Sequence, residues 1–496
     1  MSAEAPELLD VLIVGAGLSG IGAAHHLQRS CPAKRYAILE ARDAIGGTWD
    51  LFRYPGVRSD SDMFTLSYPF RPWTDPKAIV DGWSILDYIR QTAQEAGITQ
   101  HIRFGHQVKS AAWSGAEACW TLTVEVDGTV RTLRTRFLWL CSGYYSYAAG
   151  HRPEFPGEAD FEGQLVHPQF WPPGLDHAGK KIVVIGSGAT AVTLVPELAK
   201  TAAQVTMLQR SPSYVVNLPS VDTLAQSLGT RLPAGLRYRL ARWRNLMVNG
   251  FYYRMARRRP ELVKQRITSM AAADLGSAEL AAQHFTPRYA PWDQRVCVAP
   301  DGDLFRAIRA GRADVVTDTI ERFTPEGIRT TGGQQLAADI VVVATGLKLN
   351  VLGDITFTLD GQPLDPGQAV SYKGMMLGDV PNLAATFGYT NASWTLKADL
   401  IAGYVCRLLR HMDRQGAAVV VPRRDPSEPT QPFLGLSSGY VQRAAGLLPQ
   451  QGTHAPWRAN QSYVADLMAL RWSRLDDGVL RFEKKKNEKQ DLRKAA

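Results

Sequence analysis

Two glycine-rich turns, each lying between a run of β-branched residues and a helix-like segment, constrain the fold of this chain more than any other feature. The first turn ends the stretch VLIVGAGLSG, and the second lies in KKIVVIGSGATAV. A strand, a tight glycine turn and a helix together hold a pyrophosphate at the helix N-terminus, because glycine lets the backbone approach the phosphate closely. The chain is therefore predicted to be an α/β protein with two Rossmann-like dinucleotide-binding domains.

The first turn contains Gly15, Gly17, Ser19 and Gly20, and the strand-like YAILE that follows the helix ends in Glu40. A carboxylate at this position accepts hydrogen bonds from the hydroxyls of an adenosine ribose. This pattern indicates a site for FAD or NAD, whose ribose carries no 2′-phosphate.

The second turn is followed by different residues at the corresponding place. Its loop residues are Gly186, Ser187, Gly188, Ala189, Thr190 and Ala191, and the next strand-like segment ends in Gln209 followed by Arg210. An arginine complements a 2′-phosphate, which favours NADPH; the alternative is a solvated surface charge. An FAD site followed by an NADPH site predicts a flavoprotein that transfers hydride from NADPH to FAD.

The cysteines limit which electron acceptor the reduced flavin can have. The five cysteines, Cys31, Cys119, Cys141, Cys297 and Cys406, include no C-x-x-C pair. Their spacing argues against a zinc site, a disulfide framework and the redox-active pair of a disulfide reductase. No metal is expected, and the predicted electron acceptor is dioxygen, a quinone or a carrier protein.

The segment FEGQLVHPQFWPP, between the two turns, narrows this choice. Phe161, Gly163, His167, Trp171 and Pro172 fit the pattern F-x-G-x-x-x-H-x-x-x-W-P. This pattern resembles the fingerprint of type I Baeyer-Villiger monooxygenases, which are class B flavoprotein monooxygenases. The resemblance extends along nearly the whole chain, and APWDQRVCV and GYTNASWTLKADL are most similar to the subgroup of ethionamide-activating and long-chain alkane-associated flavin monooxygenases.

The resemblance implies an activity. In this family, FAD reduced by NADPH reacts with dioxygen to give a peroxyflavin, which converts a ketone to an ester. Lipophilic linear or aryl-alkyl ketones are the expected substrates, and sulfoxidation is expected as well. Two alternatives stay open, namely oxidation of long-chain alkanes or of sulfur and nitrogen atoms, and, from another class, an electron-transfer flavoprotein reductase.

The resemblance also assigns site residues. Arg295, in PWDQRVCV, matches the catalytic arginine of the family, and Asp60, in RSDSD, matches the aspartate that positions it beside the flavin. A guanidinium suits a site with developing negative charge because it stays protonated. The alternatives for Arg295 are that neighbouring Arg288 is the matching arginine or that Arg295 forms an ordinary ion pair, and the alternative for Asp60 is a helix cap. Further cofactor contacts are expected from Gly47, Thr48, Trp49, Asp50, Leu51, Arg58, Ser59, Asp60 and, through its main chain, Val108.

The order of these motifs predicts the domain boundaries. Residues 1–154 and 351–480 are expected to form the FAD-binding domain, 155–211 and 294–350 the NADPH-binding domain, and 481–496 a disordered basic tail. Residues 212–293 are predicted to be a helical insertion in the NADPH domain, with an apolar stripe and many arginines. Such a segment either packs on its own domain or lies on a membrane surface.

Composition sets broad limits on partners and location. The net charge of +9 suits phosphate-bearing cofactors, and no basic-aromatic motif accompanies it that would indicate nucleic-acid binding. The N-terminal sequence MSAEAPELLD lacks the basic region of a secretory signal. We expect a cytoplasmic monomer that acts on small molecules, with peripheral membrane contact through the insertion as the alternative.

Overall fold

The first glycine turn joins β1 (Leu8–Val14) to α1 (Leu18–Ser30) at the centre of the larger of two main sheets. The computed structural model describes residues 7–229, 231–435 and 437–485. The larger sheet has nine strands in the order β20-β19-β4-β5-β6-β1-β2-β3, with β23 paired to β6. Its other strands are β2 (Tyr36–Leu39), β3 (Ile102–Arg103), β4 (His106–Ser114), β5 (Cys119–Val126), β6 (Thr129–Leu140), β19 (Thr356–Leu359), β20 (Gln362–Leu364) and β23 (Leu383–Ala385).

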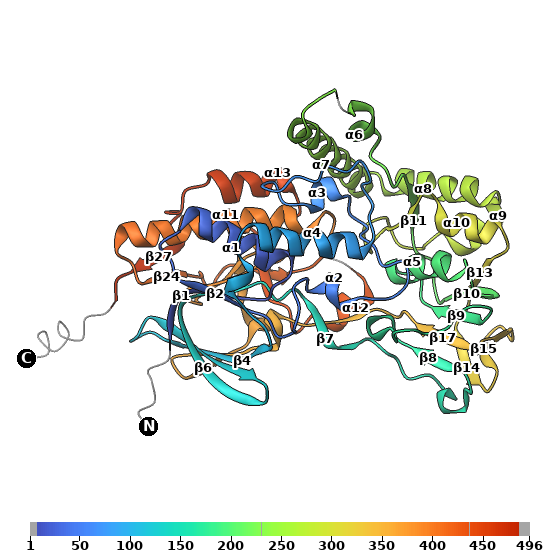
Figure 1. Ribbon diagram of the computed structural model, residues 1–496, viewed down its shortest axis with the longest axis horizontal. Coiled ribbons are helices and arrows are strands. Elements are labelled where there is room, and N and C mark those ends of the chain that lie inside the picture. The colour runs from blue at the N-terminus through green and yellow to red at the C-terminus, as the bar shows by residue number, and fades with distance from the viewer. Residues whose placement is uncertain (1–6, 230, 436, 486–496) are drawn as a thin grey trace, which may run out of the picture.

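Helices cover the central parallel strands of this sheet. β1 pairs in parallel with both β2 and β6, and Val11, Leu12 and Ile13 are fully buried. α1 packs against α11 (Trp394–Gln415) and α4 (Gly82–Glu95), and the three helices lie together above the sheet in Figure 1. A parallel strand covered on both faces needs a continuous apolar sequence, which explains the run VLIV.

The second glycine turn joins β9 (Lys181–Ile185) to α5 (Ala189–Leu198) in a separate five-stranded sheet. All its strands are parallel, in the order β13-β10-β9-β17-β8. The remaining strands are β8 (Gln164–Val166), β10 (Gln204–Gln209), β13 (Ala313–Thr317) and β17 (Ile340–Val343). The chain thus contains the two predicted dinucleotide-binding folds, at the left and right of Figure 1.

Two antiparallel strands connect the folds. The chain leaves the first fold through β7 (Tyr145–Gly150) and returns through β18 (Leu347–Leu349). They pair with Leu347 opposite Gly150 and Leu349 opposite Tyr145. Among the described residues, the chain crosses between the domains only in these two paired strands. Any movement of one domain against the other must therefore involve this pair.

The insertion is helical, as predicted, within a frame of two short strands. β11 (Val215–Leu218) pairs in parallel with β12 (Cys297–Pro300), which precedes α10 (Asp303–Arg309). Between them lie α6 (Thr223–Leu228), α7 (Ala234–Arg258), α8 (Pro260–Leu275) and α9 (Ala278–His284). In Figure 1, α6 and α7 lie at the upper edge of the molecule.

The C-terminal part corrects one boundary. Residues 481–483, predicted to begin a disordered tail, belong to β27 (Leu480–Glu483), which pairs with β24 (Val419–Pro422). Alternating Leu480 and Phe482 supply apolar contacts to the core, so this short segment is ordered by packing despite its charged neighbours. The predicted tail from residue 486 lies outside the described residues.

Several short elements complete the fold. They are α2 (Thr48–Leu51), α3 (Met63–Leu66), α12 (Gly439–Arg443), α13 (Tyr463–Asp466), a π-helical segment η6 (Leu467–Trp472), and the strands β14 (Ile320–Thr324), β15 (Gly327–Thr330), β16 (Gln335–Ala337), β21 (Val370–Tyr372), β22 (Met376–Leu377), β25 (Thr430–Pro432) and β26 (Gln450–Gly452). None of the helices in the described part of the chain combines the length and the apolar character that a bilayer-spanning segment needs.

Candidate active site

The first glycine turn is shaped by close backbone contacts. Gly15 has a φ of +103°, and a Cβ on it would lie 2.5 Å from the carbonyl oxygen of Cys141. A Cβ on Gly20 would lie 1.9 Å from the carbonyl oxygen of Gly15. Gly17 precedes α1 and gives it no side-chain cap, so the first N–H groups of this helix are available to an anion. This geometry fits the pyrophosphate of a dinucleotide.

Glu40 is held beside this turn. Its side chain is 4% exposed and accepts hydrogen bonds from the backbone N–H of Ala16, at 2.8 Å, and of Arg42, at 3.0 Å. Burial raises the pKa of this carboxyl, and the two backbone N–H groups oppose that rise. A carboxylate held in this way can accept hydrogen bonds from ribose hydroxyls, as the sequence predicted. The turn and Glu40 together therefore fit the adenosine and pyrophosphate parts of FAD.

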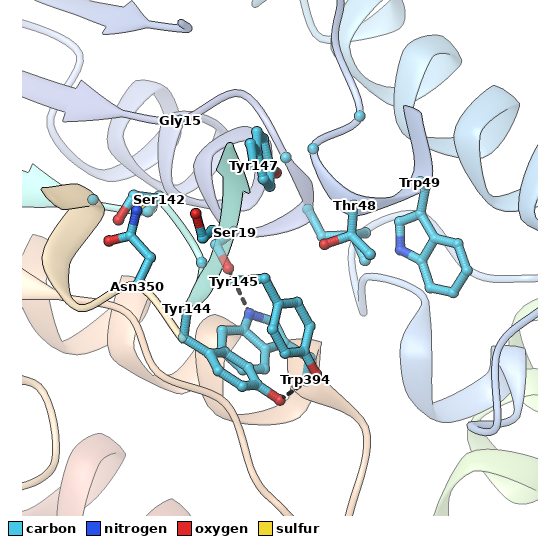
Figure 2. Close-up of a pocket in the computed structure, with 18 of the residues that line it drawn as sticks. Gly15, Ser19, Thr48, Trp49, Ser142, Tyr144, Tyr145, Tyr147, Asn350 and Trp394 are labelled. Carbon is cyan, nitrogen blue, oxygen red and sulfur yellow. Dashed lines mark hydrogen bonds between the residues drawn. The ribbon is translucent and has the colours of Figure 1, made fainter. Parts of the chain in front are cut away.

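A cavity of about 420 Å³ extends from this turn toward the second domain. Figure 2 shows part of its wall, which includes Ser19 of α1, Thr48 and Trp49 at the start of the short helix α2, and Trp394 of α11. The predicted site residues that line it are Gly15, Gly17, Ser19, Glu40, Gly47, Thr48, Trp49, Arg58, Ser59, Asp60, Val108, Ala189 and Arg295. Residues separated by up to 280 positions in the sequence thus form one cavity, at the ends of the parallel strands where ligands bind in such folds.

Asp50 and Leu51 do not line this cavity, although both were expected to contact a cofactor. The Asp50 carboxylate is 1% exposed and receives hydrogen bonds from Arg42 at 2.6 Å, Arg53 at 2.8 Å and Arg90 at 3.2 Å. Three guanidinium groups satisfy the charge of this buried carboxylate, as burial requires. Asp50 is therefore the centre of an ion-pair cluster and lies on the same short helix as Thr48 and Trp49, which line the cavity.

The second glycine turn has the same construction. A Cβ on Gly186 would lie 2.4 Å from the carbonyl oxygen of Ala344, whereas Gly188 has open space and no side-chain cap for α5. The Ser187 hydroxyl shares a hydrogen bond of 2.8 Å with the hydroxyl of Ser213. This turn leaves the N-terminus of α5 free for the second dinucleotide.

The last residue of β10, Gln209, and the residue after it, Arg210, have different environments. Gln209 is 2% exposed, and its amide donates to the carbonyl of His284 and the hydroxyl of Thr317, both at 2.8 Å. Its side chain is therefore turned into the domain, and only its main chain faces the turn. Arg210 is exposed, so its guanidinium is available for the predicted contact with a 2′-phosphate.

Arg295 lies on the cavity wall, on the side of the second domain. Its side chain is exposed to the cavity, and Nη2 donates a hydrogen bond of 3.0 Å to the hydroxyl of Tyr144. The oxygens of Tyr144, Tyr145, Tyr440 and Asp60 raise the pKa of Arg295 above its usual value, with the largest contribution from Tyr144. The guanidinium therefore carries a fixed positive charge in the cavity.

Asp60 lies on the same wall but does not form an ion pair with Arg295. Among the described residues, its carboxylate oxygens are more than 4.0 Å from the Arg295 nitrogens. Burial raises the pKa of Asp60, and the charges of Arg295 and Arg58 oppose this shift. The predicted positioning of Arg295 by Asp60 is thus electrostatic in this structure, whereas Tyr144 makes the direct contact.

The neighbours of Asp60 resolve the alternative that Asp60 is a helix cap. The helix cap in RSDSD is Asp62, whose side chain accepts a hydrogen bond from the backbone N–H of Thr65 at the start of α3. Asp60 has no such role and faces the cavity. Arg58 pairs with Asp303 at 2.5 Å, which joins the loop of Asp60 to α10 of the second domain.

Known proteins resemble this chain in sequence over most of its length. A family model described as "Flavin-binding monooxygenase-like" matches residues 10–226. The FAD-containing monooxygenase EthA of Mycolicibacterium smegmatis is 52% identical over 481 residues, which cover 96% of this chain and 98% of that protein. The chain belongs to the flavin-binding monooxygenase-like family. A probable FAD-binding monooxygenase, AlmA of Acinetobacter baylyi, is 48% identical over 96% of each chain.

Solved structures support the fold of this monooxygenase. Oxidized steroid monooxygenase bound to NADP aligns with a TM-score of 0.76 at 21% identity, over 96% of this chain and all of that one. The predicted relation to type I Baeyer-Villiger monooxygenases is confirmed, as are the α/β class with two dinucleotide-binding folds and the cofactors FAD and NADPH. The enzyme passes electrons to dioxygen, so an electron-transfer reductase is no longer a competing function.

The monooxygenase site contains two tyrosines that the sequence did not single out, and the first of them contacts Trp394 of the segment NASWTLK, which the sequence indicated as a flavin contact. Tyr144 stacks on Trp394 with ring centroids 5.1 Å apart, and its hydroxyl shares a 2.8 Å hydrogen bond with that of Tyr145. Trp394 donates from Nε1 to the hydroxyl of Ser19 at 2.7 Å, as Figure 2 shows. The segment CSGYYSY could have indicated these tyrosines, because it follows the carboxyl end of β6, where side chains reach a ligand.

The fingerprint segment of the monooxygenase lies beside the strands that connect the domains. A Cβ on Gly163 would lie 2.4 Å from the ring of Phe161 and 2.6 Å from the carbonyl oxygen of Asp339, so glycine is required there. The ring of His167 packs on Gly150, where a Cβ would lie 2.0 Å from Cε1. Burial lowers the pKa of His167. His167 is thus a packing residue at the domain connection and lies outside the cavity wall.

In the described part of the chain, no group of three or more His, Cys, Asp or Glu side chains is arranged to hold a metal ion.

Proposed function

We propose that this enzyme is a Baeyer-Villiger monooxygenase that converts lipophilic linear or aryl-alkyl ketones to esters and also oxidises sulfides. One oxygen atom of dioxygen is inserted between the carbonyl carbon and a neighbouring carbon. The other oxygen atom leaves as water, for which NADPH supplies a hydride, with its two electrons and one hydrogen, and the solvent supplies one proton. The observation that carries the proposal is the position of Arg295, a cation on the cavity wall that no carboxylate neutralises directly among the described residues.

FAD supplies the redox chemistry when bound, because it accepts hydride from NADPH and activates dioxygen. The residues proposed to hold it are Gly15, Gly17, Glu40, Thr48 and Trp49, all of which line the cavity. NADPH is proposed to bind at the turn from Gly186 to Ala191, with Arg210 at the 2′-phosphate. These assignments are supported by the close-packed glycines and by the exposed Arg210.

The role proposed for Arg295 is to stabilise negative charge that develops on oxygen during the transfer. Such groups act strongly where water is excluded and where the donor is already oriented. The hydrogen bond to Tyr144 orients the guanidinium, and the stacked ring of Trp394 supports Tyr144. Asp60 contributes a carboxylate whose field favours the charged form of Arg295.

Oxidation of long-chain alkanes or of heteroatoms alone is the second candidate, since APWDQRVCV and GYTNASWTLKADL resemble segments of the subgroup that includes long-chain alkane-associated enzymes. The aromatic lining of the cavity accepts lipophilic groups of either kind. A panel of linear ketones, aryl-alkyl ketones, alkanes and sulfides, incubated with NADPH and labelled dioxygen, separates the candidates. We expect singly labelled esters from ketones; ketone-dependent NADPH consumption without any ester would contradict the proposal.

A monomeric, cytoplasmic enzyme without nucleic-acid partners stays a prediction. The proposed cytoplasmic location is supported by five free cysteines, all buried, which suit a reducing compartment. Sedimentation of the purified protein would test the monomer directly.

A further inference from the structure

α7 is oriented with its apolar side outward. Its buried residues are Tyr238, Ala241, Arg242, Asn245 and Ala256, several of which are polar. On the opposite side, spaced by three or four residues, lies the outer stripe of α7, which is defined as Leu236, Leu240, Trp243, Met247 and Phe251. These five side chains are between 43% and 58% exposed. An ordinary surface helix has the reverse arrangement.

Polar contacts hold the helix in this orientation. Nη1 of Arg242 donates to the backbone carbonyl of Phe64 at 2.8 Å and also to that of Ser67 at 3.2 Å. The amide of Asn245 donates to Asp62 at 3.0 Å and to Asp222 at 2.9 Å. A rotation that buried the outer stripe would break these bonds and leave their buried acceptors, the carbonyls beside α3 and the carboxylate of Asp222, without donors, which is costly. The exposure of the stripe is therefore built into the fold.

A second apolar stripe continues the first. Val464, Met468 and Trp472, at intervals of four residues on α13 and η6, are 43%, 58% and 65% exposed. The two segments meet where the rings of Trp243 and Tyr463 contact each other, with centroids 6.1 Å apart. Both lie along the upper edge of the molecule in Figure 1. We call these eight exposed side chains the outer apolar surface.

This concentration is not a general property of the molecule. Of eighteen large apolar side chains that are exposed in the described residues, ten lie on α7 or in the α13–η6 segment. Scattered single apolar residues need no explanation, whereas a contiguous group marks an interaction site.

The charge around the outer apolar surface identifies its partner. α7 contains seven arginines and no acidic residue. Arg239, Arg254 and Arg258 are exposed, and none of them pairs with a carboxylate in the described part of the chain. A second copy of this chain would bring the same arginines together, which repulsion opposes. A lipid bilayer with negatively charged headgroups matches both the exposed arginines and the exposed apolar side chains, because its interior is apolar.

We propose that the outer apolar surface docks on a bilayer containing anionic phospholipid. Trp243 and Trp472 would lie at the level of the headgroups, and the arginines would contact lipid phosphates while their stems cover apolar surface. The surface is also close to the site, since Asn245 binds Asp62, two residues after Asp60. Only the benefit of docking, access to lipophilic ketones, rests on the proposed function.

The test is flotation of purified, FAD-loaded protein with vesicles of phosphatidylcholine, with and without phosphatidylglycerol. We expect the protein to float with the anionic vesicles, less at high salt and little with pure phosphatidylcholine. Absence of binding to anionic vesicles at low salt would overturn the proposal. Because flotation requires no turnover, this result is independent of whether ketones are substrates.

Two variants locate the surface. R239E/R254E/R258E is expected to weaken vesicle binding by at least about a hundredfold, since each basic residue near an anionic surface contributes roughly fivefold and the new carboxylates add repulsion. W243S/M247S/F251S is expected to abolish binding that resists salt. The matched control R131E/K180E/R312E changes exposed basic residues elsewhere and is expected to bind like the parent protein. Equal loss in this control would show non-specific attraction and overturn the proposal.

A probe that reports insertion completes the test. All five native cysteines are buried, so a cysteine introduced by Met247→Cys can be labelled selectively with an environment-sensitive fluorophore. We expect a blue shift on addition of anionic vesicles, and none for Val130→Cys, which is 66% exposed on the hairpin of β5 and β6. A blue shift at Met247→Cys that depends on protein concentration without vesicles would favour a second copy as the partner instead.

Discussion

Nη2 of Arg295 donates a hydrogen bond of 3.0 Å to the hydroxyl of Tyr144, so residues from different domains meet at the cavity. Tyr144 follows the last strand before the connection, and Arg295 precedes β12 in the second domain. The cation on which the proposed chemistry depends is therefore oriented by the partner domain. This relationship links the arrangement of the two domains to the presence of a competent site.

Replacing the cation should separate the two half-reactions. We expect Arg295→Ala to lower oxygenation by roughly a hundredfold or more, the size of effect seen when a charge-stabilising donor is removed. Reduction of the flavin by NADPH, followed by stopped-flow absorbance, should change little, because hydride transfer does not use this charge. Arg288→Ala, a nearby exposed arginine, serves as the control. Ester formation at the parent rate would show that another residue supplies the charge.

Removing only the hydrogen bond between Arg295 and Tyr144 should have a smaller effect. Tyr144→Phe keeps the ring that stacks on Trp394 and deletes the hydroxyl that accepts from Arg295. A hydrogen bond of this kind contributes about 1 kcal/mol, so kcat is expected to fall roughly fivefold with little change in KM for NADPH. A loss as large as that of Arg295→Ala would instead assign Tyr144 a direct role in the reaction.

Coenzyme preference should depend on Arg210. Arg210→Ser is expected to raise KM for NADPH roughly tenfold or more, since a hydrogen bond between charged groups contributes about 1.5 to 3 kcal/mol. KM for NADH, which lacks the 2′-phosphate, should stay within about twofold. Steady-state kinetics with both coenzymes measure the ratio, and Arg312→Ser is a control at another exposed arginine. Parallel changes for both coenzymes would contradict the assignment.

The contact between His167 and Gly150 should be required for the domain connection. Gly150→Ala places a methyl carbon 2.0 Å from Cε1 of His167, so the ring or the strand must shift. Overpacking of this kind costs about 1 to 3 kcal/mol of unfolding free energy, measured by urea denaturation.

The double variant provides the control for this prediction. Adding His167→Ala to Gly150→Ala should recover part of the lost stability, because it removes the clashing ring. If the two substitutions were simply additive, the contact would not be the cause of the loss.

His25 predicts how stability depends on pH. Burial and the neighbouring His26 lower the pKa of His25 from 6.5 to about 4, and its ring stacks on Phe70 with centroids 3.6 Å apart. Below pH 6.5 the unfolded chain binds a proton that the folded chain does not, so stability falls as the pH falls toward 4.

Removal of this group should flatten the pH profile. His25→Phe keeps an aromatic ring and should remove about 1 to 2 kcal/mol of the loss between pH 6.5 and 4, after allowance for partial exposure of the ring. His454→Gln, at a side chain that is 77% exposed, should leave the profile unchanged. Thermal unfolding at several pH values measures both, and identical profiles for parent and His25→Phe would contradict the prediction.

The sequence by itself determined the features that depend on local geometry. A tight turn between strand and helix needs glycine where backbones touch, and Gly15, Gly20 and Gly186 are in such contacts. Glu40 was predictable because a parallel strand–helix–strand unit brings the end of its second strand beside the turn that follows the first. The fingerprint around Gly163 and His167 was recognisable because its packing tolerates few alternatives.

Tertiary structure decided the features that depend on how distant segments meet. The direct partner of Arg295 is Tyr144, 151 positions away, and no spacing in the sequence encodes that contact. The apolar stripe of α7 was visible in the sequence, but periodicity shows only which residues share a face. The bonds from Arg242 and Asn245 to the loop after Asp60 decide which way that face points. These bonds keep the apolar face outward because the buried guanidinium of Arg242 needs the backbone carbonyls of α3 as acceptors. Only the folded chain brings those carbonyls next to Arg242.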